Sequence, residues 1–184
     1  EQVSFGGESN YFSIKPGQSL LRERFHVIKA TGVVTGYGFI NLNGNEEIPE
    51  GKMAVAQELY SIDSAQEKDY TEYVGHMAEY YLDLADESDK RIILFEREDR
   101  STELSLAGED IGSESHTGAI TYYTEEGREN TRRVSESAVA FFNGRNVGRF
   151  SESLVEELFN AESSIKLIDN NGDRSVDVIF IYQY

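Results

Sequence analysis

An acidic loop near the C-terminus places oxygen-bearing side chains at a spacing that suits a metal ion. The loop reads DNNGDRSVD over residues 169–177, and its candidate ligands are Asp169, Asn171, Asp173 and Asp177. Calcium prefers many oxygen ligands, and alternate positions of a loop can wrap around a single ion. Arg174 stands where such loops prefer glycine, and no bidentate glutamate follows. The pattern therefore predicts either a weak calcium site or an Asx-rich hairpin turn, and we favour the turn, with no cofactor.

The other chemically capable residues form no recognisable constellation. His26, His76 and His116 are far apart in the sequence, without a second histidine or a carboxylate at a metal-ligand spacing, so each is expected to be a surface or half-buried side chain. Gly36-Tyr37-Gly38 lacks the third glycine and the helix of a dinucleotide site. A glycosidase needs two carboxylates in a cleft, and among 34 acidic residues the sequence singles out no pair. We expect no catalytic residues and no enzyme activity.

The composition narrows the classes of partner. The net charge of −17 disfavours nucleic acids and anionic membranes, because both attract clustered Lys and Arg. No run of about 18 apolar residues is present, so we expect no membrane insertion. The absence of cysteine excludes disulfides and thiolate zinc sites. The chain begins at Glu1 rather than at Met, which suggests a processed product or an excised segment.

Short runs of β-branched and aromatic residues, separated by turn residues, predict a mainly β chain. The runs cover residues 25–35, 53–56, 91–96, 120–123, 131–134, 138–142, 164–168 and 176–182. Gly32 suggests a bulge or bend in the first run. Asn143-Gly144 signals a tight turn. The last run is apolar on both faces, with Val178 and Phe180 on one and Ile179 on the other, which is typical of a central, buried strand.

Two segments carry helical signals. Ser153 and Glu156 fit a capping box, and the apolar stripe that follows predicts one short helix. Residues 65–84 also fit helical spacing, but Gly75 interrupts the pattern, and residues 77–82 would fit a strand equally well. Residues 1–20 are rich in Gly, Ser and Asn, so we interpret them as an arm or linker.

The C-terminal pattern resembles a known group of modules. VAFFNGRNVGRFSESLVEEL (139–158) and SIKLIDNNGDRSVDVIFIYQY (164–184) are similar to modules of Gram-positive bacterial surface proteins, often beside S-layer homology domains, and to virion structural proteins of their phages. VIKATGVVTGYGFINLNGNEEIPEGKMAV (27–55) and YVGHMAEYYLD (73–83) resemble the same family. In that family, the segment corresponding to residues 73–83 is a short helix, a glycine and a strand. The resemblance therefore divides residues 65–84 at Gly75.

Many short strands separated by turn signals predict two small barrel-like or sandwich subdomains, which we place at residues 21–107 and 108–184, the second with the short helix. The resemblance implies a role: a non-catalytic structural or interaction module of an extracellular surface or virion assembly, acting through protein partners or self-assembly. A carbohydrate-binding domain is the first alternative, suggested by Tyr80-Tyr81 and Tyr122-Tyr123. A hydrolase with paired carboxylates is the second.

Overall fold

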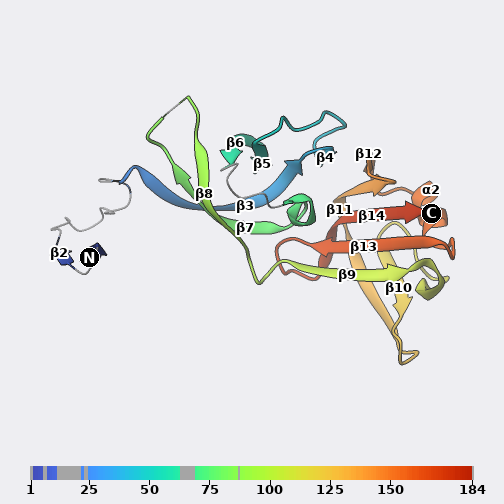
Figure 1. Ribbon diagram of the computed structural model, residues 1–184. Coiled ribbons are helices and arrows are strands. Elements are labelled where there is room, and N and C mark those ends of the chain that lie inside the picture. Colours follow the sequence, from blue (N-terminus) through green and yellow to red (C-terminus); the bar gives the residue numbers. More distant parts are fainter. Residues whose placement is uncertain are drawn as a thin grey trace.

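Two six-stranded β-sheets that lie side by side form the body of the protein (Figure 1), and a separate two-stranded sheet forms near the N-terminus. The computed structural model describes residues 2–5, 8–11, 22, 25–62, 69–86 and 88–183. The chain is 10% helical, far below the third or so that is average for globular proteins, and the predicted mainly β fold with barrel-like sheets is confirmed. Within the described residues, no helix is long and apolar enough to cross a membrane.

The N-terminal sheet closes on itself as a small barrel. Its strands are β3 (Val27–Tyr37), β4 (Ile40–Asn41), β5 (Lys52–Val55), β6 (Glu58–Ile62), β7 (Met77–Asp83) and β8 (Arg91–Arg97). They follow the order β4-β3-β5-β6-β8-β7, and β3 also pairs with β7, which completes the ring. Closure is possible because β3 is long: its first part pairs with β7 and its last part with β5.

The predicted bulge in β3 lies elsewhere than expected. Gly32 pairs in regular register with Ala78, and the irregularity falls between Val34 and Gly36, where β3 pairs with β5. Gly32 instead allows close packing, since a Cβ there would lie 3.1 Å from the Ala56 Cβ. The prediction of a bulge at Gly32 was therefore wrong, and the glycine is needed there for close packing.

The C-terminal sheet has the order β10-β11-β14-β13-β9, with β12 also paired to β11. Its strands are β9 (Thr102–Ala107), β10 (Ala119–Tyr123), β11 (Glu129–Phe142), β12 (Arg145–Arg149), β13 (Ser163–Asp169) and β14 (Ser175–Gln183). Two runs predicted as separate strands, 131–134 and 138–142, form the single strand β11. The Asn143-Gly144 turn is confirmed, with both residues at positive φ.

The prediction that the last strand is central and buried is confirmed. β14 lies between β11 and β13 and has apolar residues on both faces. Val178 and Phe180 pack with the barrel residues in one core, where the Phe180 ring stacks on Phe141 at 4.7 Å between centroids. Ile179 and Ile181 pack on the opposite face with Val155 and Leu158 of the helix α2 (Glu152–Leu158). One core thus joins the two sheets and a second lies under α2.

The predicted boundary between the two subdomains, after residue 107, does not coincide with the boundary between the two sheets. The chain crosses from one sheet to the other between Arg97 and Thr102, so residues 102–107, which we assigned to the N-terminal subdomain, pair with β13 in the C-terminal sheet. Within the expected arm, β1 (Gln2–Phe5) and β2 (Glu8–Tyr11) pair antiparallel. Residues 1, 6, 7 and 12–20 lie outside the described part.

The two helical signals have different outcomes. The division at Gly75 is confirmed: a 3₁₀ turn η1 (Thr71–Tyr73) precedes it and β7 follows, while residues 65–68 lie outside the described residues. Gly75 has φ +96°, which only glycine adopts easily. The helix α2 also exists, but its N-cap is Ser151 and the predicted capping box of Ser153 and Glu156 does not form. Ser151 takes the extended conformation that starts the helix earlier, which leaves Ser153 inside the first turn.

Candidate functional site

The acidic loop 169–177 connects β13 to β14, and Asp169 organises it. The carboxylate of Asp169 is almost fully buried and accepts hydrogen bonds from the backbone N–H groups of Asn171 (3.2 Å), Gly172 (2.7 Å) and Arg174 (2.8 Å). Asn171 and Asp173 each accept a bond from the backbone two residues ahead. These are the contacts of Asx turns, in which side-chain oxygens bind amides of their own loop.

Asp177 and Arg174 lie in the second half of the same loop. Asp177 accepts a hydrogen bond from the Asn170 N–H at 3.1 Å. Burial, followed by the charges of Asp173 and Asp169, raises the pKa of Asp177, although the bond from Asn170 opposes the shift. Arg174 has φ +71°, the left-handed conformation for which calcium loops use glycine. Within the described residues its guanidinium forms no ion pair with any carboxylate of the loop.

His76 occupies the buried junction between the sheets. The expectation of a surface or half-buried side chain was wrong for this histidine, which is 0% exposed. Its Nδ1 lies 2.7 Å from the Ser101 Oγ and its Nε2 lies 3.1 Å from the Glu103 Oε2. Burial, reinforced by the charge of Arg97, lowers the pKa of His76 to about 4 although Glu103 acts in the opposite direction. The imidazole is therefore neutral near pH 7.

The Ser101–His76–Glu103 row has the residue types of a hydrolytic triad but not its accessibility. Ser101 is 3% exposed, and its hydroxyl lies against the Asp169 carbonyl oxygen at 3.3 Å as well as against His76. A nucleophilic serine must reach a substrate carbonyl. The row instead connects the barrel, through His76, to β9 and β13, which fits a structural link between sheets.

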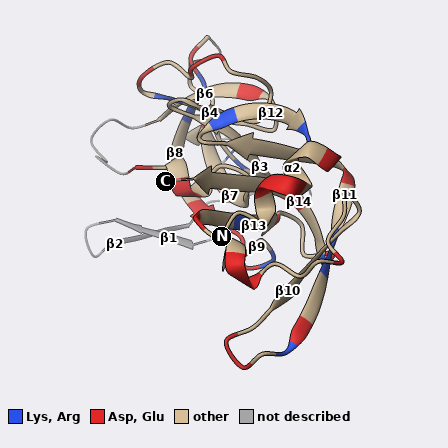
Figure 2. Ribbon diagram, turned by 90° about the vertical axis from the view of Figure 1, so that its right-hand side faces the viewer, with Lys and Arg blue, Asp and Glu red and all other residues tan. Residues whose placement is uncertain are grey.

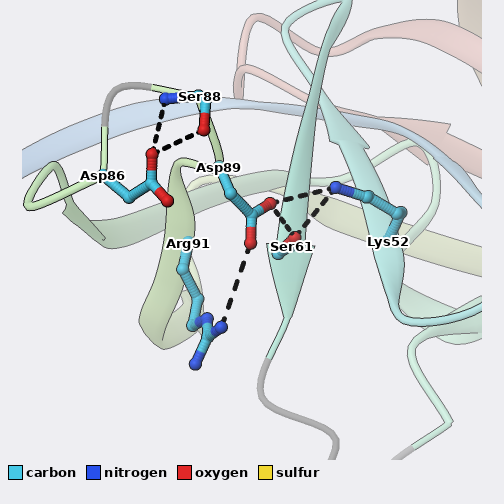
Figure 3. A network of polar contacts seen from close by, with 6 residues as sticks. All are labelled: Lys52, Ser61, Asp86, Ser88, Asp89 and Arg91. Carbon is cyan, nitrogen blue, oxygen red and sulfur yellow. Dashed lines mark hydrogen bonds and ion pairs between the residues drawn. The ribbon is translucent and has the colours of Figure 1, made fainter.

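A second polar cluster, at the edge of the barrel, also links neighbouring strands (Figure 3). Asp89 Oδ1 accepts hydrogen bonds from the Ser61 hydroxyl and from Lys52 Nζ at 3.1 Å, and Lys52 Nζ also donates to Ser61 Oγ at 2.9 Å. Arg91 lies 3.9 Å from the other carboxylate oxygen of Asp89. Lys52 Nζ forms an ion pair with Asp89, so both polar partners of the Ser61 hydroxyl are engaged within the cluster. The cluster joins β5, β6 and the start of β8, which are neighbours in the barrel.

An open groove lies where the barrel meets the hairpin of β11 and β12. It encloses about 520 Å³. Its lining residues are Phe39, Asn45, Asn143, Gly144 and Arg145. Ligand-binding clefts commonly have volumes of about 300–1,000 Å³, so the groove is large enough for a small ligand. No titratable acid–base pair lines it, which makes it better suited to binding than to catalysis.

Asparagine side chains fix the walls of this groove. Asn45 and the Asn146 backbone form a reciprocal pair, with Asn146 N–H donating to Asn45 Oδ1 at 2.9 Å and Asn45 Nδ2 donating to the Asn146 carbonyl at 3.0 Å. Asn146 Nδ2 donates to the carbonyls of Asn41 and Leu42. On the other wall, Asn143 Oδ1 accepts from the Gln183 N–H at 2.8 Å. The groove is thus held between the two sheets before any ligand arrives.

The tyrosine pairs divide as their strand spacing predicts. Tyr80 and Tyr122 are buried, whereas Tyr81 is half-buried and Tyr123 is exposed. The most exposed large apolar side chain among the described residues is Phe39, at 66%. Phe39 was not among the residues predicted from the sequence. A single signal was available, an aromatic residue directly after the Gly36-Tyr37-Gly38 turn.

The candidate residues therefore fall into separate places. The four predicted metal ligands share one loop, His76 lies at the buried junction, and His26 and His116 are exposed. The sequence did not predict that His76 meets Ser101 and Glu103, or that the groove residues lie together. These residues lie on or next to separate elements, among them β9, β12 and the β3–β4 turn, which meet only in the fold. Comparisons with protein-family models, with curated proteins and with solved structures find no match for this chain.

Proposed function

We propose that the chain is a non-catalytic interaction module of a larger cell-surface or virion assembly, and that it contacts its neighbours through the hairpin of β10 and β11. The observation that carries this proposal is the projection of the hairpin from the body (Figure 1). Its tip, residues 123–129, extends past the isolated bridge between Ile111 and Tyr122, and β14 pairs with β11 only from Arg133 onward. Residues 125–131 are all exposed.

A projecting hairpin of this kind benefits from a partner. An isolated two-stranded hairpin is only marginally stable in water, because neither face is covered. The tip carries charges of both signs (Figure 2). It offers an exposed aromatic, Tyr123, and the Glu126–Arg128 ion pair at 3.0 Å. Aromatic and arginine side chains are enriched in protein interfaces. The polar groups at His76 and at Asp89 are satisfied by partners within each cluster, and the His76 imidazole is fully buried, which also favours a structural role over a catalytic one.

Self-association of the purified chain tests this proposal. We expect the average mass in sedimentation equilibrium to rise with concentration, and the rise to disappear in a Tyr123→Ala, Arg128→Glu double variant. Phe159→Ala is the matched control, because Phe159 is an equally exposed aromatic, at 41%, away from the hairpin. A chain that stays monomeric at every concentration, or a double variant that associates like the parent, would contradict assembly through this hairpin.

A carbohydrate-binding role is the second candidate, and a different observation favours it. One tyrosine of each pair that first suggested this role is buried in a core. Phe39, in contrast, is exposed beside the amide and guanidinium groups of the groove. Hydrolysis of a glycoside would need two carboxylates at the sugar. The groove is lined by none.

A further inference from the structure

Two turns from different sheets form the groove and hold its shape. The Gly38-Phe39 turn joins β3 to β4, and the Asn143-Gly144 turn joins β11 to β12. The Asn45–Asn146 pair and the bonds from Asn146 Nδ2 to the Asn41 and Leu42 carbonyls hold the two turns together, and the bond from Gln183 to Asn143 fixes the second turn on its own sheet. Binding to a preformed site loses less conformational entropy than binding to loops that must first become ordered. A ligand in this groove therefore meets walls that are already in place.

Phe39 supplies an apolar surface at one side of the groove. A phenyl ring that is 66% exposed forgoes most of the free energy that its burial would give. The ring lies next to Gly144, since a Cβ on Gly144 would be 3.7 Å from Phe39 Cε2. The absence of a side chain at Gly144 keeps the space beside the ring open. A ligand with a flat apolar face can cover the ring there.

The polar groups of the groove are donors. Asn143 uses its Oδ1 for the Gln183 N–H, and its Nδ2 donates no hydrogen bond to any described residue. Arg145 forms no ion pair within the described part of the chain. It is the single charged residue that lines the groove, in a chain of net charge −17. Figure 2 shows basic residues (blue) at β12, which begins at Arg145. The groove therefore complements a ligand that accepts hydrogen bonds and carries a negative charge.

We propose that the groove binds a saccharide that carries a carboxylate. The C–H face of a pyranose ring covers Phe39, the carboxylate pairs with the Arg145 guanidinium, and a ring hydroxyl accepts from Asn143 Nδ2. Guanidinium and carboxylate form charge-assisted, often bidentate hydrogen bonds, which distinguish an acidic sugar from a neutral one. The inference specifies the ligand for the carbohydrate-binding candidate and does not depend on assembly through the β10–β11 hairpin.

An extended acidic peptide fits the groove less well than a sugar ring. Peptides gain much of their affinity by adding a strand to an open sheet edge. The outer edge of β12 is already occupied at Asn146, whose N–H and carbonyl both bond to the Asn45 side chain. A compact ring needs no backbone ladder and makes use of the exposed phenyl group.

Titration with a matched pair of sugars tests the proposal. The probes are tetragalacturonate and the neutral maltotetraose, followed by amide and side-chain NMR shifts of the full chain. We expect the acidic sugar to shift Asn143, Gly144 and Arg145 and to bind at least about tenfold more tightly than the neutral sugar, equivalent to about 1.4 kcal/mol. Phe39→Ala should weaken both sugars, whereas Arg145→Gln should abolish the preference for the acidic sugar.

Controls separate the groove from general surface effects. Tyr123→Ala and Arg128→Gln change an exposed aromatic and an exposed arginine at the β10–β11 tip and should leave sugar binding unchanged. Unchanged melting temperatures would show that the groove variants remain folded. The proposal is overturned if neither sugar shifts the groove at millimolar concentration, if binding survives both groove variants, or if a glutamate-rich peptide binds the groove more tightly than tetragalacturonate. Loss of sugar binding with intact self-association would leave the assembly proposal standing.

Discussion

His76 Nε2 lies 3.1 Å from Glu103 Oε2, although the two residues belong to different sheets. His76 directly precedes β7 of the barrel, and Glu103 lies on β9 of the C-terminal sheet. Glu103 also lies 3.7 Å from Arg97 Nη1 and 3.8 Å from Lys166 Nζ. A second proton on His76 would add a buried positive charge beside these two cations. The protonation state of His76 therefore bears on how firmly the sheets are joined.

We predict that acid destabilises the fold through His76. Its pKa is about 4 in the folded chain and near 6.5 when unfolded, so between these values the unfolded chain binds a proton that the folded chain does not. The free energy of unfolding contributed by this group is fully present above about pH 6.5. It should fall by up to about 3 kcal/mol as the pH drops to about 4. Chemical denaturation across this range measures the slope.

The matched variants are His76→Gln and His26→Gln. His76→Gln should flatten the pH dependence relative to the parent, even if the variant is less stable overall, because it removes the titrating group. His26 is exposed, so His26→Gln should keep the parental slope. An NMR titration that gives His76 a pKa near 6.5 would refute the prediction.

Phe180→Ala should be among the costliest single changes in the chain. Phe180 is nearly fully buried on the face of β14 that meets the barrel, and its ring stacks on Phe141. Truncating such a side chain costs about 3–5 kcal/mol through lost burial and the cavity left behind. Urea denaturation gives the value, and Phe159→Ala, at an exposed phenylalanine, should change it little. A cost below about 1 kcal/mol for Phe180→Ala would contradict the shared core.

Thr35→Val should stabilise the protein. Thr35 is buried in β3, and its Oγ1 has no hydrogen-bond partner in the described structure. Valine has nearly the same shape, so the change removes an unsatisfied hydroxyl for a gain of about 1 kcal/mol. Thr121→Val is the control: Thr121 is equally buried, but its hydroxyl lies 3.2 Å from the Thr131 hydroxyl, so its loss should destabilise. Thermal melts of both variants decide the matter, and a lower melting temperature for Thr35→Val would refute it.

The sequence predicted local structure better than assembly of the sheets. The Asn143-Gly144 turn and the two apolar faces of β14 are encoded within a few neighbouring residues, and both predictions are confirmed. Periodicity across residues 65–84 pointed to a helix and was misleading, because Gly75 sits at φ +96° against Ile168 of the other sheet. The position of β9 was missed for a similar reason: its partner β13 lies some sixty residues away.

The candidate sites, too, could be predicted only where their residues are close together in the sequence. Asp169 and Asp177 could be grouped because they belong to one loop. His76 gained its partners, Ser101 and Glu103, through the packing of the barrel on the second sheet, and the groove gained Phe39 and Arg145 from two separate turns. A lone histidine and an exposed aromatic have no sequence pattern that identifies their neighbours, so only the fold brings out these sites.

The loop 169–177 should be held by its own hydrogen bonds rather than by calcium. Both carboxylate oxygens of Asp169 already accept backbone N–H groups, three in all. Asp169→Ala should therefore cost about 1.5–3 kcal/mol, because three backbone N–H groups lose a charged acceptor. Millimolar calcium should leave the melting temperature of the parent chain unchanged.

Arg174→Gly separates the remaining interpretations of that loop. The variant should be more stable by about 1 kcal/mol, because glycine adopts φ +71° without the clash that the arginine Cβ suffers. If the Arg174 guanidinium stood in for an ion, removing it would give the variant a calcium response that the parent lacks. Arg174 pairs with none of the loop carboxylates in the described structure, so we expect calcium to leave the variant unchanged as well. Thermal melts with and without millimolar calcium measure both effects. A calcium-dependent rise in the parent that Asp173→Ala removes would show instead that Asp169, Asn171, Asp173 and Asp177 bind the ion together.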